Sequence, residues 1–477
     1  MYRKTYLSIC LLLYFTTASM QSESQQLSSA VKQFVSVSAD TVALTHVIVI
    51  DGTGGTAKND QAILIIKGRI AKIGNTKSVI IPASAKIVDG TGKTVIPGMI
   101  MMHEHLFYGE SEPPLYLGVE MPISFPRLYL AGGATTIRTT GSVEPQTDLN
   151  IKKAIDKGQM AGPDIDATGP YIERELLPIP EVQFIKSSEE AAEEVNYWIA
   201  SGSTSFKVYM DITKDDLKAV AAVAHQHNLK VTGHLCSLTY REAAELGIDN
   251  LEHGFIPASD FVTGKKENVC PFGSVTPSLK NLEVNSVAMK DLMKFLIEKK
   301  VAITSTLPVF EPNTGREMVP GGGEAALAPQ IKEAVEKNYN AQNGKDTSDI
   351  TLFKKEMAWE KQFVEMGGRL MAGVDPTGAG RTIPGYADQH TLELLVEAGF
   401  SLPMAVKICS LNAAEYLGRD KEIGSIAEGK RADLVLIDGD IQRDIHAVRN
   451  TEIVFKNGIG YDSKKIFESV KGMVGLH

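Results

Sequence analysis

Cysteine and tryptophan are scarce in this chain, which has four cysteines and two tryptophans among 477 residues. The cysteines are Cys10, Cys236, Cys270 and Cys409, and no two of them have C-x-x-C spacing. A disulfide framework or a thiolate metal cluster needs several closely spaced cysteines, so neither is predicted. The sequence leaves room for one bridge and does not select its partners.

The chain also lacks a surplus of positive charge and, beyond its N-terminus, any long apolar run. Lys and Arg number 49 against 58 Asp and Glu, which gives a formal net charge of −9. This balance excludes the basic footprint that nucleic-acid binding requires. A transmembrane helix needs about 20 apolar residues, and no later segment supplies them. A small-molecule substrate is the expected partner, and a homo-oligomer is compatible with the sequence.

The first residues are typical of a secretory signal peptide. Arg3 and Lys4 precede an apolar run over 7–15, and Thr16-Thr17-Ala18 supplies small residues for cleavage. About 9–12 apolar residues are too few to span a bilayer, so no stable membrane insertion is expected after cleavage. Residues 1–18 are therefore predicted to be removed on export to the periplasm or the extracellular space. Residues 19–37 are rich in Ser and Gln and are predicted to be a flexible lead-in.

Short Val- and Ile-rich strands are predicted near both ends of the chain, separated by turn residues such as Asp51-Gly52. They cover residues 42–50, 62–67, 69–73, 86–88, 432–438 and 451–455. A few strands at one end cannot bury both of their faces. We therefore predict a small β-sandwich domain composed of residues 38–95 and 420–470, with a larger domain inserted between them.

The inserted segment, residues 96–419, alternates strand and helix patterns. Strict β-α-β order implies parallel strands with right-handed crossovers. The predicted strands are 95–102, 134–139, 165–168, 205–210, 229–232, 248–252, 301–306 and 370–374. Eight such strands predict an α/β fold, a closed (β/α)₈ TIM barrel. Two long loops, 107–127 and 308–349, are expected over its mouth.

The most informative motif is His103-Glu104-His105, which ends the first of these strands. Side chains alternate along a strand, so the two histidines face the same way and form half of a metal site. Glu104 is then expected to face away from the site, and Glu252 to face away from His253. A lone H-x-H motif is common and would mean little.

Other metal-competent residues also end predicted strands, and the C-terminal strand ends of a barrel share one face. The predicted metal-binding set is His103, His105, Lys207, His234, His253 and Asp375. Each has a simpler reading, because His234 could be a core histidine and Lys207 could extend to solvent. Their joint occurrence favours the metal site.

Lys207 needs a chemical explanation, because an ammonium group among histidines would repel a cation. A lysine that has reacted with carbon dioxide is a carbamate, an anionic ligand that can bridge two ions. Two divalent ions bring four positive charges, and Asp375, the carbamate and a bridging hydroxide bring three negative charges. This balance leaves a modest positive charge for a developing oxyanion, and we predict the carbamate on that ground.

The ordered motif set resembles the amidohydrolase superfamily, in the group related to imidazolonepropionase and to metal-dependent Xaa-Pro dipeptidases. The resemblance covers roughly residues 40 to 465. The matching segments are Val95-Ile96-Pro97-Gly98-Met99-Ile100 before the H-x-H motif, Ser205-Phe206-Lys207-Val208-Tyr209-Met210, Gly233-His234, Leu251-Glu252-His253-Gly254, Ala372-Gly373-Val374-Asp375 and the segment 423–434.

The resemblance implies a role for each residue of the set. His103, His105 and Asp375 would hold the more buried of two divalent ions, expected to be zinc, and His234 and His253 the more exposed one. Carbamylated Lys207 and a hydroxide would bridge the pair. Asp375 would be catalytic, taking the proton of the hydroxide and delivering it to the leaving nitrogen.

Several residues depart from the family pattern. Met101 stands where many relatives have Asp, Tyr209-Met210-Asp211 replaces the Ser-Gly-Gly of the dipeptidases, and Arg138-Thr139 replaces their Arg-Asp. The run around Lys207 is similar to the hydantoinase branch, except that Ile212 replaces its tyrosine. These changes concern the substrate space and not the metal ligands.

The expected function is therefore an exported, metal-dependent hydrolase of a C–N bond in a cyclic amide, an acyl-amino acid or a small dipeptide. Lactone or phosphoester hydrolysis at the same site is the alternative. A non-catalytic scaffold is disfavoured, because all six ligand positions are retained.

We predict that the protein exported by its native host begins soon after Ala18, near Ser19. The order of charged, apolar and small residues is the one that signal peptidase reads. N-terminal sequencing of the exported protein checks this. A functional protein that retains residues 1–15 would show the leader assignment to be wrong.

Overall fold

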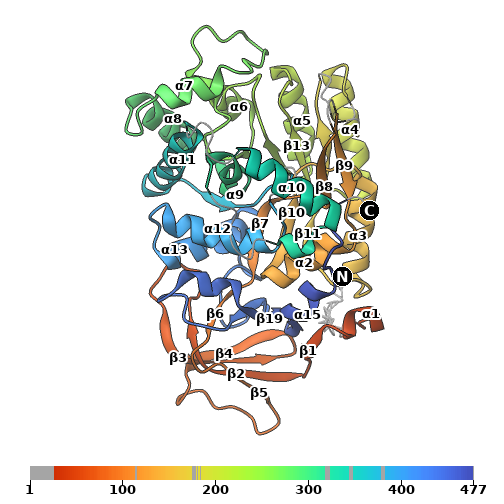
Figure 1. Cartoon of the computed structure of the whole chain (residues 1–477), viewed down its shortest axis with the longest axis vertical. Helices are drawn as coiled ribbons and strands as arrows, with labels where there is room; N and C mark the ends of the chain where they lie inside the picture. The colour runs from red at the N-terminus through yellow and green to blue at the C-terminus, as the bar shows by residue number, and fades with distance from the viewer. Residues whose placement is uncertain are drawn as a thin grey trace, which may run out of the picture.

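The computed structural model describes residues 26–112, 115–174, 179, 181–182, 184–316, 323–342, 348–377 and 382–475. The predicted signal peptide, 1–18, lies outside these residues, as do residues 19–25 of the lead-in. Parallel strands surrounded by helices make up most of the molecule, and a sheet built from both chain ends lies at one end (Figure 1). Within the described residues, no helix combines the length and apolarity that a membrane crossing requires.

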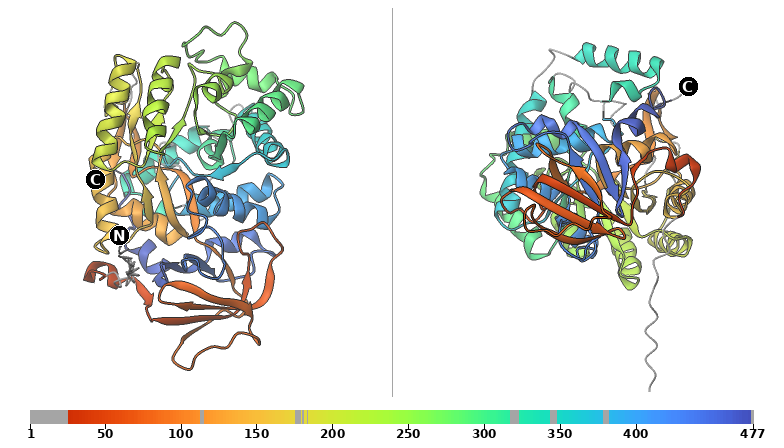
Figure 2. Two further views of the ribbon diagram at one scale, coloured as in Figure 1. Left: turned by 180° about the vertical axis from the view of Figure 1, so that it is seen from behind. Right: turned by 90° about the horizontal axis from the view of Figure 1, so that it is seen from below.

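Strands from the two ends of the chain join in one nine-stranded sheet, ordered β1-β20-β19-β18-β6-β2-β3-β4, with β5 paired to β2. The junction is the antiparallel pair β6 and β18, in which Ile96 lies opposite Val435. The bounds are β1 (Val35–Val37), β2 (Thr41–Val49), β3 (Lys58–Ile66), β4 (Arg69–Asn75), β5 (Lys86–Asp89), β6 (Thr94–Pro97), β18 (Leu434–Ile437), β19 (Thr451–Lys456) and β20 (Ile459–Asp462). Figure 2 shows this sheet from below.

Hydrogen bonds connect all nine strands, whereas two separate packed sheets were expected. The reason lies in β2, which changes partner along its length. Its residues 42–45 pair with β5 and its residues 48–49 pair with β6. Between them the register shifts, and His46 has a φ of 59°. A bulged strand of this kind can join layers that would otherwise be independent sheets.

The prediction of a flexible lead-in is wrong for residues 26–37. Helix α1 (Ser29–Lys32) is followed by β1, which pairs antiparallel with β20. Val31, Phe34 and Val37 are buried. The segment is polar in its average composition, but these three apolar residues are buried. Their burial helps to hold the segment on the fold.

The inserted segment contains all eight predicted parallel strands, the third of them divided into β11 and β12. Strand pairing gives two sheets, β11-β10-β7 and β12-β13-β14-β15-β16-β17. Their edges meet where Asp375 N donates to His103 O over 2.9 Å, and at a parallel bridge between Ser142 and Pro170. The bounds are β7 (Met99–Glu104), β10 (Ala134–Thr139), β11 (Asp164–Asp166), β12 (Thr168–Ile172), β13 (Ser205–Val208), β14 (Lys230–Gly233), β15 (Asn250–Glu252), β16 (Ala302–Ser305) and β17 (Leu370–Ala372).

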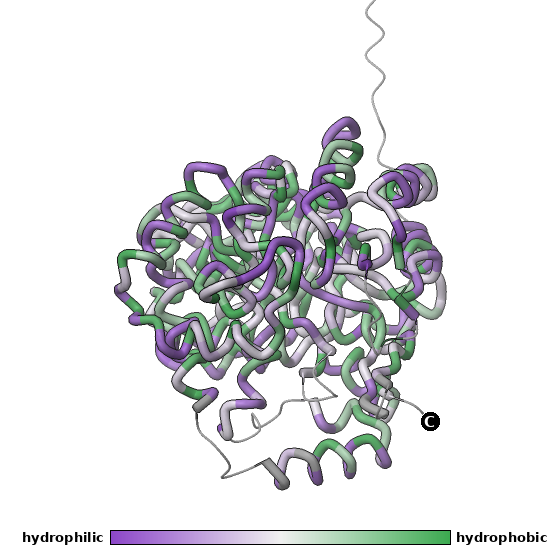
Figure 3. Tube along the Cα trace, turned by 90° about the horizontal axis from the view of Figure 1, so that it is seen from above, coloured by the Kyte–Doolittle hydropathy of each residue, from purple (hydrophilic) through white to green (hydrophobic). Residues whose placement is uncertain are grey.

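Helices cover these strands, and seen from above their traces alternate hydrophilic and hydrophobic segments, as amphipathic helices do (Figure 3). Thr213 and Thr239 begin α5 and α6 with capping boxes, completed by Asp216 and Glu242. The bounds are α2 (Ser124–Gly132), α3 (Pro145–Asp156), α4 (Ser188–Ser201), α5 (Lys214–Gln226), α6 (Tyr240–Leu246), α7 (Val275–Asn281), α8 (Val287–Glu298), α9 (Leu307–Phe310), α10 (Pro329–Gln342), α11 (Ser348–Glu365), α12 (Tyr386–Glu397), α13 (Leu402–Ile408), α14 (Leu411–Tyr416) and α15 (Ser463–Glu468).

The two segments predicted as long loops contain regular structure. Residues 107–127 form the hairpin β8 (Phe107–Glu112) and β9 (Leu115–Glu120) and the start of α2. Residues 308–349 contain most of α9, two short 3₁₀ helices and α10. Alternating apolar residues such as Leu115, Leu117 and Val119 are the strand signal within the first segment.

One disulfide joins Cys236 and Cys270, whose Cα atoms lie 4.7 Å apart. The sequence allowed one disulfide without identifying its cysteines, and the structure identifies this pair. Cys409 is buried and free.

A partly buried ionic cluster links the parallel strands to the nine-stranded sheet. Asp164, at the start of β11, accepts hydrogen bonds from Arg419 (3.0 Å) and Arg431 (2.8 Å). Lys456 of β19 lies 3.0 Å from the other carboxylate oxygen. Burial alone would raise the pKa of Asp164, but these three cations hold it well below its usual range. A cavity of about 440 Å³ opens beside the cluster.

A second cluster surrounds His390 of α12. Its Nε2 lies 2.6 Å from Glu311, and its Nδ1 lies 2.5 Å from Glu393. Burial lowers the pKa of His390, but the hydrogen bonds to the two carboxylates outweigh it and raise the pKa to about 9. The imidazole is therefore charged at neutral pH.

We predict that this cluster makes the free energy of unfolding depend on pH above neutrality. The pKa of an unfolded histidine is about 6.5. The stabilisation that the charged His390 gives the folded state is therefore complete below that pH and is lost as pH rises through about 9. The slope of stability against pH between 7 and 10 should be shallower in His390→Gln than in the parent protein. Urea unfolding across this range measures it. His225→Asn, at an exposed histidine, is the control, and parallel profiles for His390→Gln and the parent would contradict the assignment.

Candidate metal and catalytic site

The ends of β7 and β17 bring two histidines and a carboxylate together. His103 and His105 are buried, and their ring centroids lie 5.4 Å apart on one face, as predicted. Asp375 follows β17 with a φ of 51°. Its Oδ1 lies 3.2 Å from His105 Nε2 and 3.7 Å from His103 Nε2. The side chain of Asp375 is 13% exposed, so the carboxylate remains accessible.

His253 and His234 continue this group from neighbouring strands. His253 follows β15 with a φ of 67°, and its ring lies 4.5 Å from that of His103. The ring of His234, just after β14, lies 4.4 Å from that of His253. One ligand atom each from His103, His253 and Asp375 lies within 4.8 Å of the other two. These three residues form a compact candidate site for a metal ion.

The donor atoms fit such an ion. His103 Nε2 is buried and has no hydrogen-bond partner, a costly state that a cation would relieve. Burial lowers the pKa of His103, His234 and His253 well below the usual range. Burial would raise the pKa of Asp375, but the surrounding histidines hold it well below its usual value. Neutral imidazoles and an ionised carboxylate are the forms that bind a metal.

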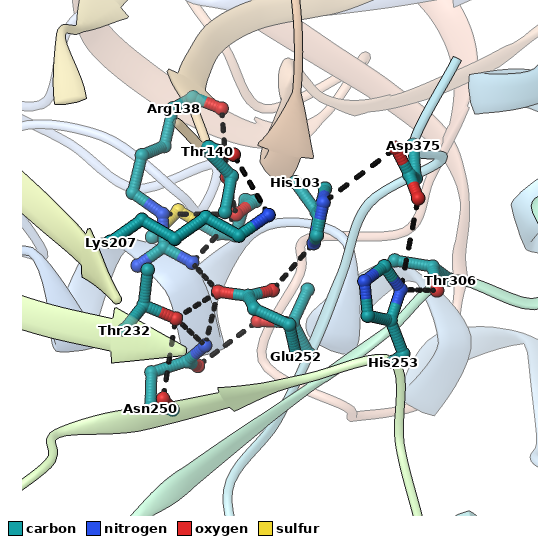
Figure 4. A network of polar contacts seen from close by, with 12 residues as sticks. His103, Arg138, Thr140, Lys207, Thr232, Asn250, Glu252, His253, Thr306 and Asp375 are labelled. Atoms are coloured by element: carbon teal, nitrogen blue, oxygen red, sulfur yellow. Dashed lines mark hydrogen bonds and ion pairs between the residues drawn. The ribbon is translucent and has the colours of Figure 1, made fainter. Parts of the chain in front are cut away.

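Lys207 of β13 is buried beside this group. Its Nζ donates to Thr140 O over 3.0 Å and lies 4.9 Å and 5.2 Å from the ring centroids of Tyr171 and Tyr209. Figure 4 shows its amine pointing toward His103. Burial lowers the pKa of Lys207 to about 8. A larger fraction of the amine is therefore neutral than in an exposed lysine.

All six predicted residues thus lie in one region at the C-terminal ends of parallel strands. His103, His253 and Asp375 form the compact group, and His105, His234 and Lys207 lie against it. His225 and His446, which carried no such prediction, pair with Asp249 and Glu393 elsewhere.

Sequence reasoning missed a carboxylate in contact with the site. The prediction that Glu252 faces away is wrong, because its Oε2 lies 2.7 Å from His103 Nδ1. Strict alternation ends at this strand terminus, where His253 adopts a positive φ. Glu104 behaves as predicted and accepts a hydrogen bond from Val374 N over 3.1 Å. Arg138, a charged residue within a predicted parallel strand, was the signal that a buried acidic partner exists.

Aromatic side chains line part of the site. Tyr171 places its hydroxyl 3.4 Å from His105 Nε2, and the ring of Phe310 lies 5.8 Å from that of His253. Tyr116, on the hairpin β8–β9, donates to the carbonyl of Thr377, two residues after Asp375. The hairpin therefore packs over the segment that carries Asp375, which agrees with the predicted position of the first long segment.

Comparison with known proteins gives the same family as the motif set. The model of the amidohydrolase family matches residues 94–460. Imidazolonepropionase of Geobacillus sp. (strain WCH70) is 22% identical over 423 residues, covering 83% of this chain and 89% of that protein.

Solved structures show the same fold. A putative prolidase from Bifidobacterium longum is 24% identical with a TM-score of 0.65, over 90% of this chain and 99% of that one. A Xaa-Pro dipeptidase with bound methionine in its active site is 18% identical with a TM-score of 0.64, over 88% and 100% of the two chains. The resemblance inferred from the motifs is confirmed at the level of the family.

Proposed function

Because this chain belongs to the amidohydrolase family and is a hydrolase acting on carbon–nitrogen bonds, we propose that its substrate is a cyclic amide, an acyl-amino acid or a small dipeptide. The observation that carries the proposal is the compact group of His103, His253 and Asp375 with His105 in contact. The names of the relatives, an imidazolonepropionase and prolidases, support a small substrate with an amide-type bond.

The donor set supports a centre for two divalent ions, with zinc as the expected metal. His103, His105 and Asp375 would hold one ion, His234 and His253 the other, and Lys207 would bridge them as a carbamate. Such ions, when bound, lower the pKa of water toward 7 and polarise a scissile carbonyl. The proposal takes the eight parallel strands as a closed (β/α)₈ barrel, whose C-terminal strand ends share one mouth.

The chain itself would supply the proton transfer. Asp375 is held from both sides, with Oδ1 at 3.2 Å from His105 and Oδ2 at 3.8 Å from His253. This carboxylate is ionised and partly accessible, so it can accept a proton from the attacking water and pass it to the leaving nitrogen. Tyr171 and Phe310 would contact apolar parts of the substrate and exclude bulk water.

Export to the periplasm or the extracellular space is part of the proposal. Beyond the leader sequence, the disulfide between Cys236 and Cys270 supports it, because such bonds persist mainly in oxidising compartments.

The substrate class can be tested on the metal-loaded, full-length protein with a panel of cyclic amides, acyl-amino acids, dipeptides, lactones and phosphotriesters. Turnover of at least one amide-type substrate is expected to exceed that of the other classes. Activity confined to lactones or phosphotriesters would contradict the proposed bond and would favour the alternative chemistry.

Lys207→Ala should lose metal and activity, because it removes the nitrogen on which the bridging carbamate forms. Added acetate, a short carboxylate, should restore part of both. Native mass spectrometry measures metal content, and Lys456→Ala, far from the site, is the control. Full occupancy by two ions in Lys207→Ala would exclude the bridging role.

Asp375→Asn should keep the fold and much of the metal while kcat falls by about 10²–10⁴-fold, the usual contribution of a positioned proton acceptor. The amide keeps a ligand oxygen but cannot accept the proton. Metal content and kcat are measured on the same preparation.

Glu104→Gln is the matched control for Asp375→Asn. Burial, together with Asp388, raises the pKa of Glu104 well above its usual range, which favours the neutral acid. Its side chain also faces away from the histidines, and kcat should change little. A metal-loaded Asp375→Asn enzyme with near-normal kcat would show that another group carries the proton.

A further inference from the structure

A buried chain of polar contacts lies directly beneath His103 (Figure 4). Glu252 Oε2 lies 2.7 Å from His103 Nδ1, and Glu252 Oε1 accepts from Arg138 Nη2 over 2.7 Å. None of the three side chains is exposed to solvent. We propose that Glu252 and Arg138 are positioning residues that fix the ring and the tautomer of His103 for metal binding. This inference rests on the proposed function.

The division of contacts on Glu252 favours this role over simple charge neutralisation. Arg138, Asn250 and Thr232 all donate to Oε1. The hydrogen bond on Oε2 is the one to His103. A carboxylate that served only to neutralise Arg138 would be expected to face it with both oxygens, the usual fork geometry of such pairs. Here one oxygen is directed at the imidazole.

The same contacts select the tautomer. An ionised carboxylate can only accept hydrogen bonds, so Nδ1 of His103 must donate. Nε2 then carries the free lone pair, and it is the buried atom that has no hydrogen-bond partner. Nε2 also lies on the Asp375 side of the ring, 3.7 Å from that carboxylate. The carboxylate thus leaves the nitrogen nearest the site available to a cation.

Arg138 holds the backbone as well as the carboxylate. Its Nε and Nη2 donate to Met102 O over 2.9 Å and 2.7 Å. Met102 directly precedes His103, so one guanidinium fixes both the strand that carries the histidine and the group that orients its ring. This double contact explains why an arginine is present within a strand that is buried along its whole length.

The variant Glu252→Gln tests the inference. Its zinc affinity is compared with that of the parent protein, both prepared metal-free, by competition with a chelator. The amide is nearly isosteric but uncharged, and it no longer requires Nδ1 to donate. We expect zinc affinity to fall about 10–100-fold, the usual effect of removing such a partner. The absorption spectrum of the cobalt-substituted protein should also change, because the orientation of a ligand is altered.

Two control variants separate positioning from general destabilisation. Asp164→Asn neutralises another carboxylate paired with arginines, a partly buried one. It should lower the unfolding temperature while leaving zinc affinity unchanged. Thr232→Val removes one hydrogen bond to Glu252 Oε1 and leaves the contact with His103, so zinc affinity should change less than in Glu252→Gln. Should Glu252→Gln not fold, Glu252→Asp, which withdraws the carboxylate from His103, takes its place with the same expected loss.

Equal zinc affinity and an unchanged cobalt spectrum in Glu252→Gln and the parent would overturn the inference. A parent protein that binds no divalent ion would instead contradict the proposed metal centre itself. The two failures are therefore distinguishable on the same set of proteins.

Discussion

The contact between the end of the last parallel strand and the end of the first determines the geometry of the whole site. Asp375 N donates to His103 O, and Val374 N donates to the same carbonyl. A Cβ on Gly373 would lie 2.5 Å from the Cβ of His103, so only glycine permits this approach. Because the backbones meet here, the Asp375 carboxylate reaches the imidazoles, although 270 residues separate the two segments in sequence.

Burial then sets the protonation states of the site. Desolvation disfavours charged imidazoles, so His103, His234 and His253 are held neutral. The carboxylate of Asp375 keeps its charge because the imidazoles surround it. The same burial brings Lys207 closer to its neutral form, the form of an amine that reacts with carbon dioxide. A water-filled cleft would weaken all of these effects, since the dielectric constant there is higher.

Most of the strand order and the positions of the six candidate ligands follow from the sequence, because each strand ends at a recognisable polar residue. The sequence did not reveal the partner change of β2, which accompanies register shifts around His46, a residue with a positive φ. The ordering of residues 26–37 depends on the burial of Val31 and Phe34 against distant segments. Local composition carries no information about either feature.

Glu252 is the clearest case in which the two-residue periodicity of a strand gives the wrong side-chain direction. The alternation of side chains between the two faces of a strand requires an extended backbone. His253, at the end of its strand, has a positive φ and is not extended. Glu252 directly precedes His253, one candidate ligand, and its carboxylate therefore reaches His103, a second candidate ligand on another strand. Arg138 makes this arrangement stable, because burying a carboxylate without a cationic partner is costly. The pair adds no net charge beneath the site, so the electrostatics at its mouth depend on Asp375 and on the state of Lys207.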